Sequence, residues 1–559
     1  MKKKLSDIDN PAPQASAGLR LNDRAIWPTL HNPVLRQMII AAPTETAGDT
    51  HSVIEIPCPV NLQIDLDYRG TALPACVEQG QQIERGEPLT FMQPPGHTKG
   101  GLLPTIRSPA KGMIALVSQS PVGNWQRVTL ETNNPTAIDA VGEPEKLPTE
   151  NQVAKADWHS LNKQQQWQLI FDSDIRGHGG GGFLLAAKTN AANTGQCIDT
   201  LIINAVECEP LITCDAALIK HHATNAMRGI LTLAELTECK ECIIAIEQGR
   251  EWQQTLLLQS LECLRKHTDQ MAGNNFDKHV FETVTFQTIP AIYPQGAERI
   301  LVKTVTGKTL LPDMHPGDVN VCCTNIATCH ALNTLASTGY APDKRIVTLT
   351  GDAMYGSAYG APVDLLVHYG TTVASILLTA GLKAHDIRIQ LGGPVCGTEL
   401  ASTDYAIDAA TNCIVASHSK AVSQTDNCIR CGNCVDVCPA SLLPQQLHLA
   451  VTGNKPNTAV QHGLERCIQC GCCDLVCPSQ IPLTQQFRKA RLFATAEQQS
   501  RQDAEKALQK FKNREQRLHK REVARAEQQK HRKQVSENKD AKKKAIADAL
   551  ARVRKKNSQ

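Results

Sequence analysis

The 559-residue chain lacks any apolar run approaching the roughly 18 residues that a membrane helix needs. Its first residues, MKKKLSDIDNPAP, contain lysines but lead into no apolar segment of the kind found in signal peptides. Both absences favour a chain that does not cross a membrane and that stays in a reducing compartment. We therefore expect the 22 cysteines to be ligands or buried thiols and not disulfides.

The tail from Gln485 to Gln559 lacks glycine and proline, and it contains 23 Lys and Arg against nine Asp and Glu. Because the whole chain carries +3, the remainder carries −11. Pairs such as Glu497 with Arg501 favour a helix. Since apolar residues are sparse, a solvated helix or a disordered arm is the plainest interpretation. A more specific interpretation is that the tail binds an anionic membrane surface or an acidic partner. Nucleic acid is not favoured, because aromatic residues are not interleaved with the charges.

One cysteine pattern occurs twice between residues 428 and 478. Each copy reads C-x2-C-x2-C-x3-C-P, the spacing of two-cluster bacterial ferredoxins, in which three close thiolates hold one [4Fe–4S] cube and the fourth ligates the other. We assign one cube to Cys428, Cys431, Cys434 and Cys477, and the second to Cys438, Cys467, Cys470 and Cys473. Zinc competes, but it explains neither the third cysteine nor the closing C-P. We expect Cys472 to be a packed thiol.

The rest of the chain divides by its patterns. Glycine-punctuated alternating runs predict an all-β segment that resembles a barrel-sandwich hybrid of the biotinyl or lipoyl type, with a structural Lys111. Alternating helical and strand-like pieces predict an α/β core. The predicted segments are an N-terminal arm at 1–50, the β segment at 51–135, the α/β core at 155–340, a small strand-rich domain at 341–400, the two-cluster ferredoxin-type domain at 415–485 and the tail at 486–559.

Two stretches of the α/β core suggest a ligand site. The loop from Gly177 to Phe183 contains five glycines, which let backbone N–H groups approach a phosphate or a planar ring. It does not follow a strand as the dinucleotide fingerprint requires, so a flexible turn competes. The strand predicted over TLIINAV places Asn204, Glu207 and Glu209 at its carboxyl end, where α/β sheets bind ligands. A solvated acidic turn is the alternative there.

Together these motifs resemble the C subunit of the Rnf/Rsx electron transport complex and, more distantly, the flavin subunit of respiratory complex I. The resemblance is carried by the glycine loop with Phe183 and Lys188, N-x-x-E-C-E-P at 204–210, Y-P-Q-G at 293–296, T-N-I-A-T at 324–328 and the tandem cysteine run. It implies a Rossmann-like core that binds FMN, with NADH beside it, and an SLBB β-grasp domain at 341–400.

The resemblance also implies roles for individual residues. The flavin and nucleotide pocket would be lined by Gly177, Gly179, Gly180, Gly182 and Lys188. Phe183 would lie near the nicotinamide. The flavin's polar edge and ribityl chain would be held by Asn204, Glu207 and Glu209, and its phosphate by Asn325 and Thr328.

The function implied is electron transfer between NADH, FMN and two [4Fe–4S] clusters, in a peripheral subunit of an ion-translocating NADH:ferredoxin-type oxidoreductase. Its expected place is the cytoplasmic side of the bacterial inner membrane, with integral membrane subunits and ferredoxin as partners. A non-catalytic relay with a degenerate pocket is the alternative, because Leu184, Leu185, Ala297 and Ala327 depart from the family's motifs. An iron–sulfur subunit of another oxidoreductase would not explain the glycine loop.

Overall fold

The computed structural model describes residues 53–69, 71–91, 104–132, 158–189, 198–268, 276–311, 314–383, 387–418 and 425–556. The arm predicted over 1–50 lies outside these residues. The chain forms two compact units, one up to Phe487 and one from Arg488 to Gln559. Within the described ranges, no helix has the length and apolar character that crossing a bilayer requires.

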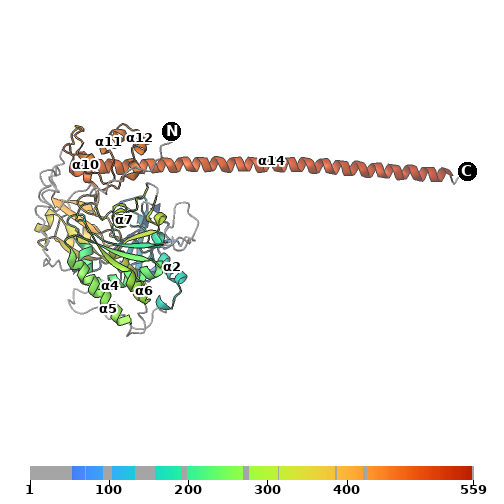
Figure 1. Ribbon diagram of the computed structural model, residues 1–559. Coiled ribbons are helices and arrows are strands. Elements are labelled where there is room, and N and C mark those ends of the chain that lie inside the picture. Colours follow the sequence, from blue (N-terminus) through green and yellow to red (C-terminus); the bar gives the residue numbers. More distant parts are fainter. Residues whose placement is uncertain are drawn as a thin grey trace, which may run out of the picture. The chain divides into compact units, whose positions relative to one another are not determined.

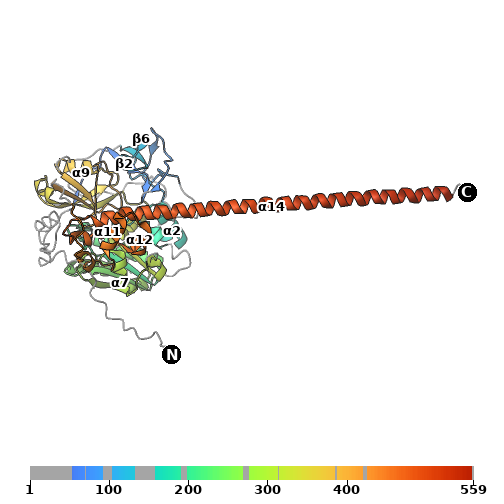
Figure 2. The ribbon, with the colours of Figure 1, turned by 90° about the horizontal axis from the view of Figure 1, so that it is seen from above.

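The segment predicted to be all β contains only strands in its described parts. An antiparallel sheet has the order β2 (Asn61–Asp65), β7 (Gln126–Thr132), β6 (Gly112–Gln119) and β5 (Gln82–Ile83), and a separate ribbon pairs β3 (Asp67–Tyr68) with β4 (Thr71–Ala72). Alternate residues such as Leu62 and Ile114 point into one core and are fully buried. Figure 2 labels β2 and β6 of this sheet in blue.

The predicted α/β core is present as a four-stranded parallel sheet with the order β10, β9, β8, β11. Its strands are β8 (Thr200–Ala205), β9 (Glu241–Glu247), β10 (Val284–Ile289) and β11 (Val321–Asn325). Its apolar residues alternate between faces, since Leu201 and Ile203 join one buried cluster while Ile202 joins another.

Helices cover both faces of this parallel sheet (Figure 1). The first cluster packs it against α4 (Cys214–Thr237), α5 (Glu251–Thr268) and α8 (Ile326–Thr338), and the second against α7 (Glu298–Thr306). The remaining helices of this region are α2 (Lys163–Asp172), α3 (Leu185–Thr189) and α6 (Lys278–Thr283). The helix α2 begins at a capping box between Asn162 and Gln165.

A second, mixed sheet has six strands and the helix α9 (Val373–Thr379) beside it. Its order is β1 (Val53–Glu55), β13 (Val363–His368), β12 (Lys344–Thr350), β16 (Cys413–His418), β14 (Ile387–Leu391) and β15 (Thr398–Glu399). The outer strand β1 and the inner strand β16 both lie outside the 341–400 segment. Cys413 is fully buried in β16, as expected for a core thiol.

The cysteine-rich segment repeats one local structure. The short helices α10 (Asn433–Asp436) and α13 (Cys472–Leu475) each begin after a glycine with positive φ, Gly432 at 89° and Gly471 at 78°. Between them lie α11 (Pro444–Thr452) and α12 (Pro456–Gln461). The tail forms α14 (Leu483–Lys556), 74 residues long, which fits a sequence without glycine or proline.

Candidate functional site

The carboxyl ends of β8 and β11 bring together residues predicted to bind one ligand. Asn204 and Asn325 are direct partners in the pairing of these strands. The chain runs outward from β8 to β9 and β10 and then returns to β11 on the other side of β8. Such a reversal of strand order leaves a crevice at the carboxyl edge of a sheet, where α/β proteins bind nucleotides.

The glycine loop lies against this edge. The backbone N–H of His178 donates to Thr328 Oγ1 at 3.0 Å. A Cβ on Gly179 would stand 3.1 Å from Asn325 Cβ, so a larger residue in the loop would require Asn325 to shift by a few tenths of an ångström. Gly180 and Gly182 have φ of 88° and 60°, the left-handed region that glycine favours.

The buried side chain of His178 anchors the glycine loop, a role that the sequence did not indicate. Its Nδ1 lies 2.9 Å from Arg176 O and its Nε2 lies 2.9 Å from Tyr369 Oη. Burial and the Arg345 guanidinium lower the pKa of His178 to about 3, so the ring is neutral. Arg345 Nη2 also donates to His178 O at 3.1 Å. The loop is thus anchored by buried groups on both sides.

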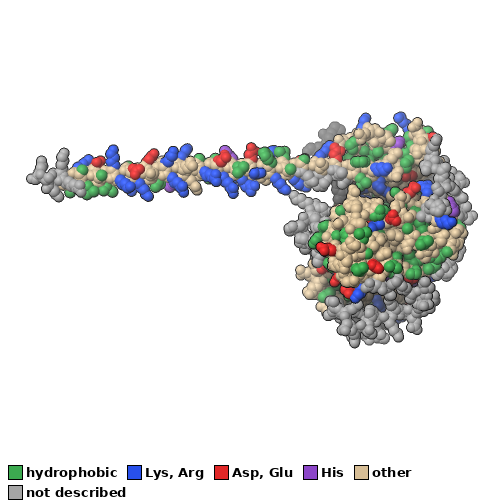
Figure 3. Space-filling model, turned by 180° about the vertical axis from the view of Figure 1, so that it is seen from behind, with side chains coloured by type: hydrophobic (Ala, Val, Ile, Leu, Met, Phe, Trp, Pro, Cys, Tyr) green, Lys and Arg blue, Asp and Glu red, His purple; other side chains and the backbone are tan. Residues whose placement is uncertain are grey.

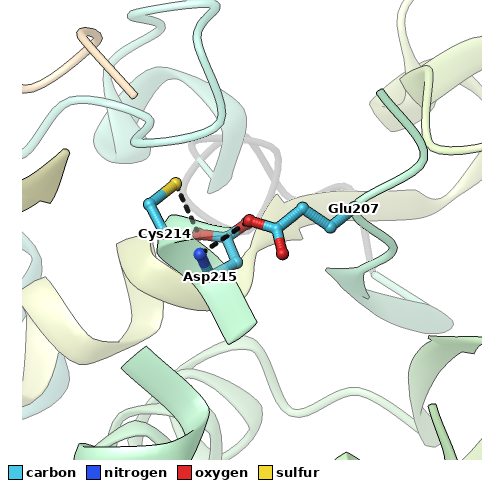
Figure 4. Close-up of side chains that lie close together, drawn as sticks. All are labelled: Glu207, Cys214 and Asp215. Atoms are coloured by element: carbon cyan, nitrogen blue, oxygen red, sulfur yellow. Dashed lines mark hydrogen bonds between the residues drawn. The ribbon is translucent and has the colours of Figure 1, made fainter. Parts of the chain in front are cut away.

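Two buried carboxyls, those of Glu207 and Asp215, lie close together (Figure 4). Glu207 accepts from the backbone N–H groups of Asp215 at 2.8 Å and Ala216 at 3.3 Å, in the positively polarised first turn of α4. Asn325 Nδ2 donates to Asp215 Oδ2 at 2.6 Å. Burial and the nearby Asp215 carboxyl raise the pKa of Glu207, and burial raises the pKa of Asp215. This pair can hold a proton at the site.

Cys214 completes a group of three possible metal ligands with Glu207 and Asp215, whose donor atoms lie within 4.8 Å of one another. The carboxylates already accept hydrogen bonds from α4 and from Asn325. Burial and the Asp215 carboxyl raise the pKa of the Cys214 thiol, so it is protonated. The capping of α4 accounts for the group without an ion.

Other predicted ligand residues are engaged with the protein itself. Lys188 is paired with Glu298 and donates to Cys323 O at 3.0 Å; although burial opposes it, the Glu298 carboxylate raises the pKa of Lys188. The Phe183 ring lies 3.5 Å from the guanidinium carbon of Arg69. This stacking gives Phe183 a fixed place beside the loop.

Glu209 contacts a different segment of the chain from Glu207. Its carboxylate accepts from the N–H groups of Val395 at 2.8 Å and Cys396 at 2.9 Å, and the Cys396 thiol donates to it at 2.9 Å. It therefore fixes a loop that connects β14 with β15. The sequence motif could not indicate this, because the loop comes 186 residues later.

The four departures from the family's motifs lie mainly in packed positions. Leu184 and Leu185 are 2% and 1% exposed, and Ala327 lies in the same core as Leu185. Ala297 is the N-cap residue of α7. The buried leucines and Ala327 thus fill a core.

Cysteines from the two runs lie near one another in two places. One small cavity is lined by Cys438, Cys467, Cys470 and Cys473, together with neighbours that include Cys472. In the other set, burial raises the pKa of Cys434 to about 11, and the nearby Cys431 and Cys477 thiols add to this shift. Cys472 is fully buried and packs against Leu475, as expected for a packed thiol.

Tyr293 links the two groups of predicted residues. Its hydroxyl donates to Cys470 O at 2.6 Å, and its ring packs with Cys472. Three residues later, Gly296 O accepts from Asn204 Nδ2 at 2.9 Å. The Y-P-Q-G motif therefore reaches from the crevice to the second cysteine set. Nothing in its spacing predicted this role.

Comparisons with known proteins match both regions. Residues 170–334 match the model of the Nuo51 FMN-binding domain, and residues 427–481 match that of a 4Fe-4S dicluster domain. The C subunit of the ion-translocating oxidoreductase complex is 33% identical in Citrobacter koseri over 87% of this chain, and 32% identical in Cronobacter sakazakii over 90%. The chain spans only 64% and 60% of these relatives.

Among solved structures, two of an NAD⁺-reducing [NiFe]-hydrogenase are similar. The air-oxidised form has 18% identity and a TM-score of 0.38, covering 55% of this chain and 53% of that chain. The H₂-reduced form has 16% identity and a TM-score of 0.42, covering 61% and 64%. Scores this low support no conclusion about the site.

Proposed function

We propose that this chain, which is similar to the C subunit of the ion-translocating oxidoreductase complex, passes electrons between NADH, FMN and two [4Fe–4S] clusters within such a complex. The observation that carries the proposal is the match to an FMN-binding domain and to a dicluster domain in one chain. The complex would lie at the bacterial inner membrane, with this subunit on its cytoplasmic side. Integral membrane subunits and a ferredoxin-type carrier would be its partners.

The residues at the crevice fit a flavin nucleotide. The glycine loop offers backbone N–H groups where a Cβ at Gly177, Gly179 or Gly181 would be crowded, and buried polar side chains lie beside it. The residues we propose to hold FMN and NADH are Gly177, Gly179, Gly180, Gly182, Phe183, Lys188, Asn204, Glu207, Glu209, Asn325 and Thr328. Glu209 would act indirectly, through the loop at Val395. Bound FMN supplies the exchange between a two-electron hydride donor and one-electron acceptors.

The cysteines fit two cubes. The cavity is lined by Cys438, Cys467, Cys470 and Cys473 as well as by Cys472, and it has no competing carboxylate among its lining residues. We propose that this set holds one cluster, and that Cys428, Cys431, Cys434 and Cys477 hold the second. Because Tyr293 connects Cys470 to the loop that binds Asn204, we propose that the first set is the nearer one to the flavin site and exchanges electrons with it directly.

The finer folds and boundaries belong to the same proposal. The β sheet within 51–135 would be a barrel-sandwich hybrid, 155–340 the Rossmann-like core, 341–400 an SLBB β-grasp, 415–485 the ferredoxin-type domain and 486–559 the tail. Lys111 is paired with Glu84 at 2.6 Å, which supports a structural lysine.

The decisive experiment adds NADH to the full chain after anaerobic reconstitution with iron, sulfide and FMN. We expect bleaching of the flavin absorbance followed by reduction of both clusters. Bound iron and sulfide without flavin or any response to NADH would leave only the relay. Zinc in place of iron would overturn the cluster assignment.

A variant separates the flavin from the clusters. Gly179→Val places a branched side chain against Asn325, so we expect loss of FMN with iron content unchanged. Retention of FMN at wild-type affinity would exclude the glycine loop as its binding site.

A further inference from the structure

The charges of α14 are distributed unevenly around its axis. Between residues 504 and 553 all side chains are exposed except the half-buried Lys506. At 100° per residue, a sector of about 160° contains eleven Lys and Arg and no Asp or Glu. This basic face consists of Lys506, Lys510, Arg514, Arg517, Lys520, Arg521, Arg525, Arg532, Lys539, Lys542 and Lys543. The remaining surface has five basic and seven acidic residues, so it is nearly neutral.

The basic face is straight and long. Lys510, Arg514, Arg517, Arg521 and Arg525 follow one another at steps of three or four residues, which stacks them in one row. From Lys506 to Lys543 the face extends over about 55 Å. Like charges at this spacing destabilise an isolated helix, and a counter-charged surface against this face would offset their repulsion.

Apolar side chains share the same sector. Ile546, Leu550 and Val553 are spaced i, i+4, i+7 and are 61%, 56% and 57% exposed. Val535 lies on this side as well and is 41% exposed. Green side chains are visible among the blue ones along α14 in Figure 3. A face that combines Lys and Arg with aliphatic residues is typical of helices that lie in a membrane interface.

We propose that the basic face of α14 binds the surface of an anionic lipid bilayer, with Ile546, Leu550 and Val553 entering the headgroup region. A flat bilayer can contact a straight row of about 55 Å along its whole length, whereas a compact 100-residue partner has a radius of gyration of only about 13 Å. Single-stranded nucleic acid would need aromatic side chains for stacking, and the one aromatic ring of this stretch, Phe511, lies outside the sector. The proposal goes beyond the electron transfer above and does not depend on it.

The test uses sedimentation of the full, cluster-loaded chain with vesicles of phosphatidylcholine containing 30% phosphatidylserine. We expect binding that is lost with vesicles of phosphatidylcholine alone and weakened by 0.5 M salt. Replacing Lys510, Lys539, Lys542 and Lys543 with Gln should lower the partition coefficient at least about 30-fold.

A matched control removes the same charge from the other side. Replacing Lys512, Lys530, Lys533 and Lys544 with Gln changes net charge and helix propensity equally, so we expect less than about a threefold loss. Circular dichroism confirms that both variants keep their helix. The proposal would be overturned if the two variants lost binding equally or if the wild type did not bind the vesicles. It would also be overturned if the chain bound only an acidic protein added as competitor. None of these outcomes would affect the response to NADH.

Discussion

Tyr293 is the residue on which the relation between the two predicted sites depends most. Its hydroxyl bonds a carbonyl 177 residues away, and it is 5% exposed. Burial raises the pKa of Tyr293, so the hydroxyl stays protonated and remains a donor. It therefore acts by positioning the loop of Cys470 and not by titration.

Tyr293→Phe should keep both clusters but alter one of them. Loss of one hydrogen bond is worth about 1 kcal/mol, which corresponds to a shift of up to about 40 mV for a one-electron centre. Potentiometric titration followed by electron paramagnetic resonance measures both centres at once. Tyr359→Phe, at a tyrosine that packs against the core of the six-stranded sheet, is the control. Equal shifts of both centres would contradict a local role.

Glu207 should make the stability depend on pH. Its pKa is raised in the folded state, so its contribution is complete below the ordinary carboxyl pKa of about 4.3 and is lost as the pH rises through the raised value. Glu207→Gln removes this titration but keeps an acceptor for α4. Between pH 5 and pH 8, the Tm of the wild type should therefore fall further than the Tm of the variant. Parallel curves, as expected for the exposed Glu262→Gln, would refute this.

Strand ends made part of the site predictable from the sequence. Asn204, Asn325 and Thr328 meet because parallel strands end at one edge, and a period of alternating apolar residues reveals such strands. The partners of Glu209 and the role of Asp215 were not predictable, because they depend on a distant loop and on the first turn of α4. The spacing of residues along the chain does not indicate contacts between distant segments.

At the scale of elements, α10 and α13 are the repeated unit of the cysteine-rich segment. Each contains the third cysteine of its run, Cys434 or Cys473, and ends before the fourth, so the fourth cysteine lies beyond the helix. This geometry agrees with Cys438 lining a cavity with Cys470. The repetition was visible in the sequence because ligand spacing is fixed by the cluster itself.

Separate replacement of Cys434 and Cys438 with Ser tests the crossed ligation. Each change should damage a different cube, since we propose that Cys434 ligates one cube with Cys477 and that Cys438 ligates the other with Cys470. Electron paramagnetic resonance of the dithionite-reduced variants distinguishes the two signals. Loss of the same centre in both variants would reject the assignment. Cys472→Ala, at a packed thiol, should leave both signals in place.

In the six-stranded sheet, local sequence patterns predict individual strands but not which strands pair. The segment at 341–400, which the sequence predicts to be rich in strands, contains β12, β13, β14 and β15. The addition of β1 and β16 to the same sheet was not predicted, because pairing between distant strands leaves no local signal.

At the scale of the whole molecule, the boundary between the two compact units at Phe487 also separates an acidic part of the chain from a basic part. Past Phe487 none of the described side chains of α14 is buried. A chain ending at Phe487 should therefore unfold within about 2 °C of the full chain, because no core residue is lost. It should also bind an anion-exchange column that the full chain passes, since its net charge becomes −11. A fall in Tm of 10 °C would show that the tail stabilises the body.

The position of β1 at the edge of the six-stranded sheet has a consequence for biosynthesis. Its partner β13 is translated about 300 residues later, which at 5–20 residues per second takes roughly 15 to 60 s. During that time the ribosome-bound nascent chain exposes an unpaired strand edge that a chaperone would have to shield. Both cysteine runs follow His418 in the chain. Iron can therefore be delivered to them only after the residues up to His418 have been synthesised.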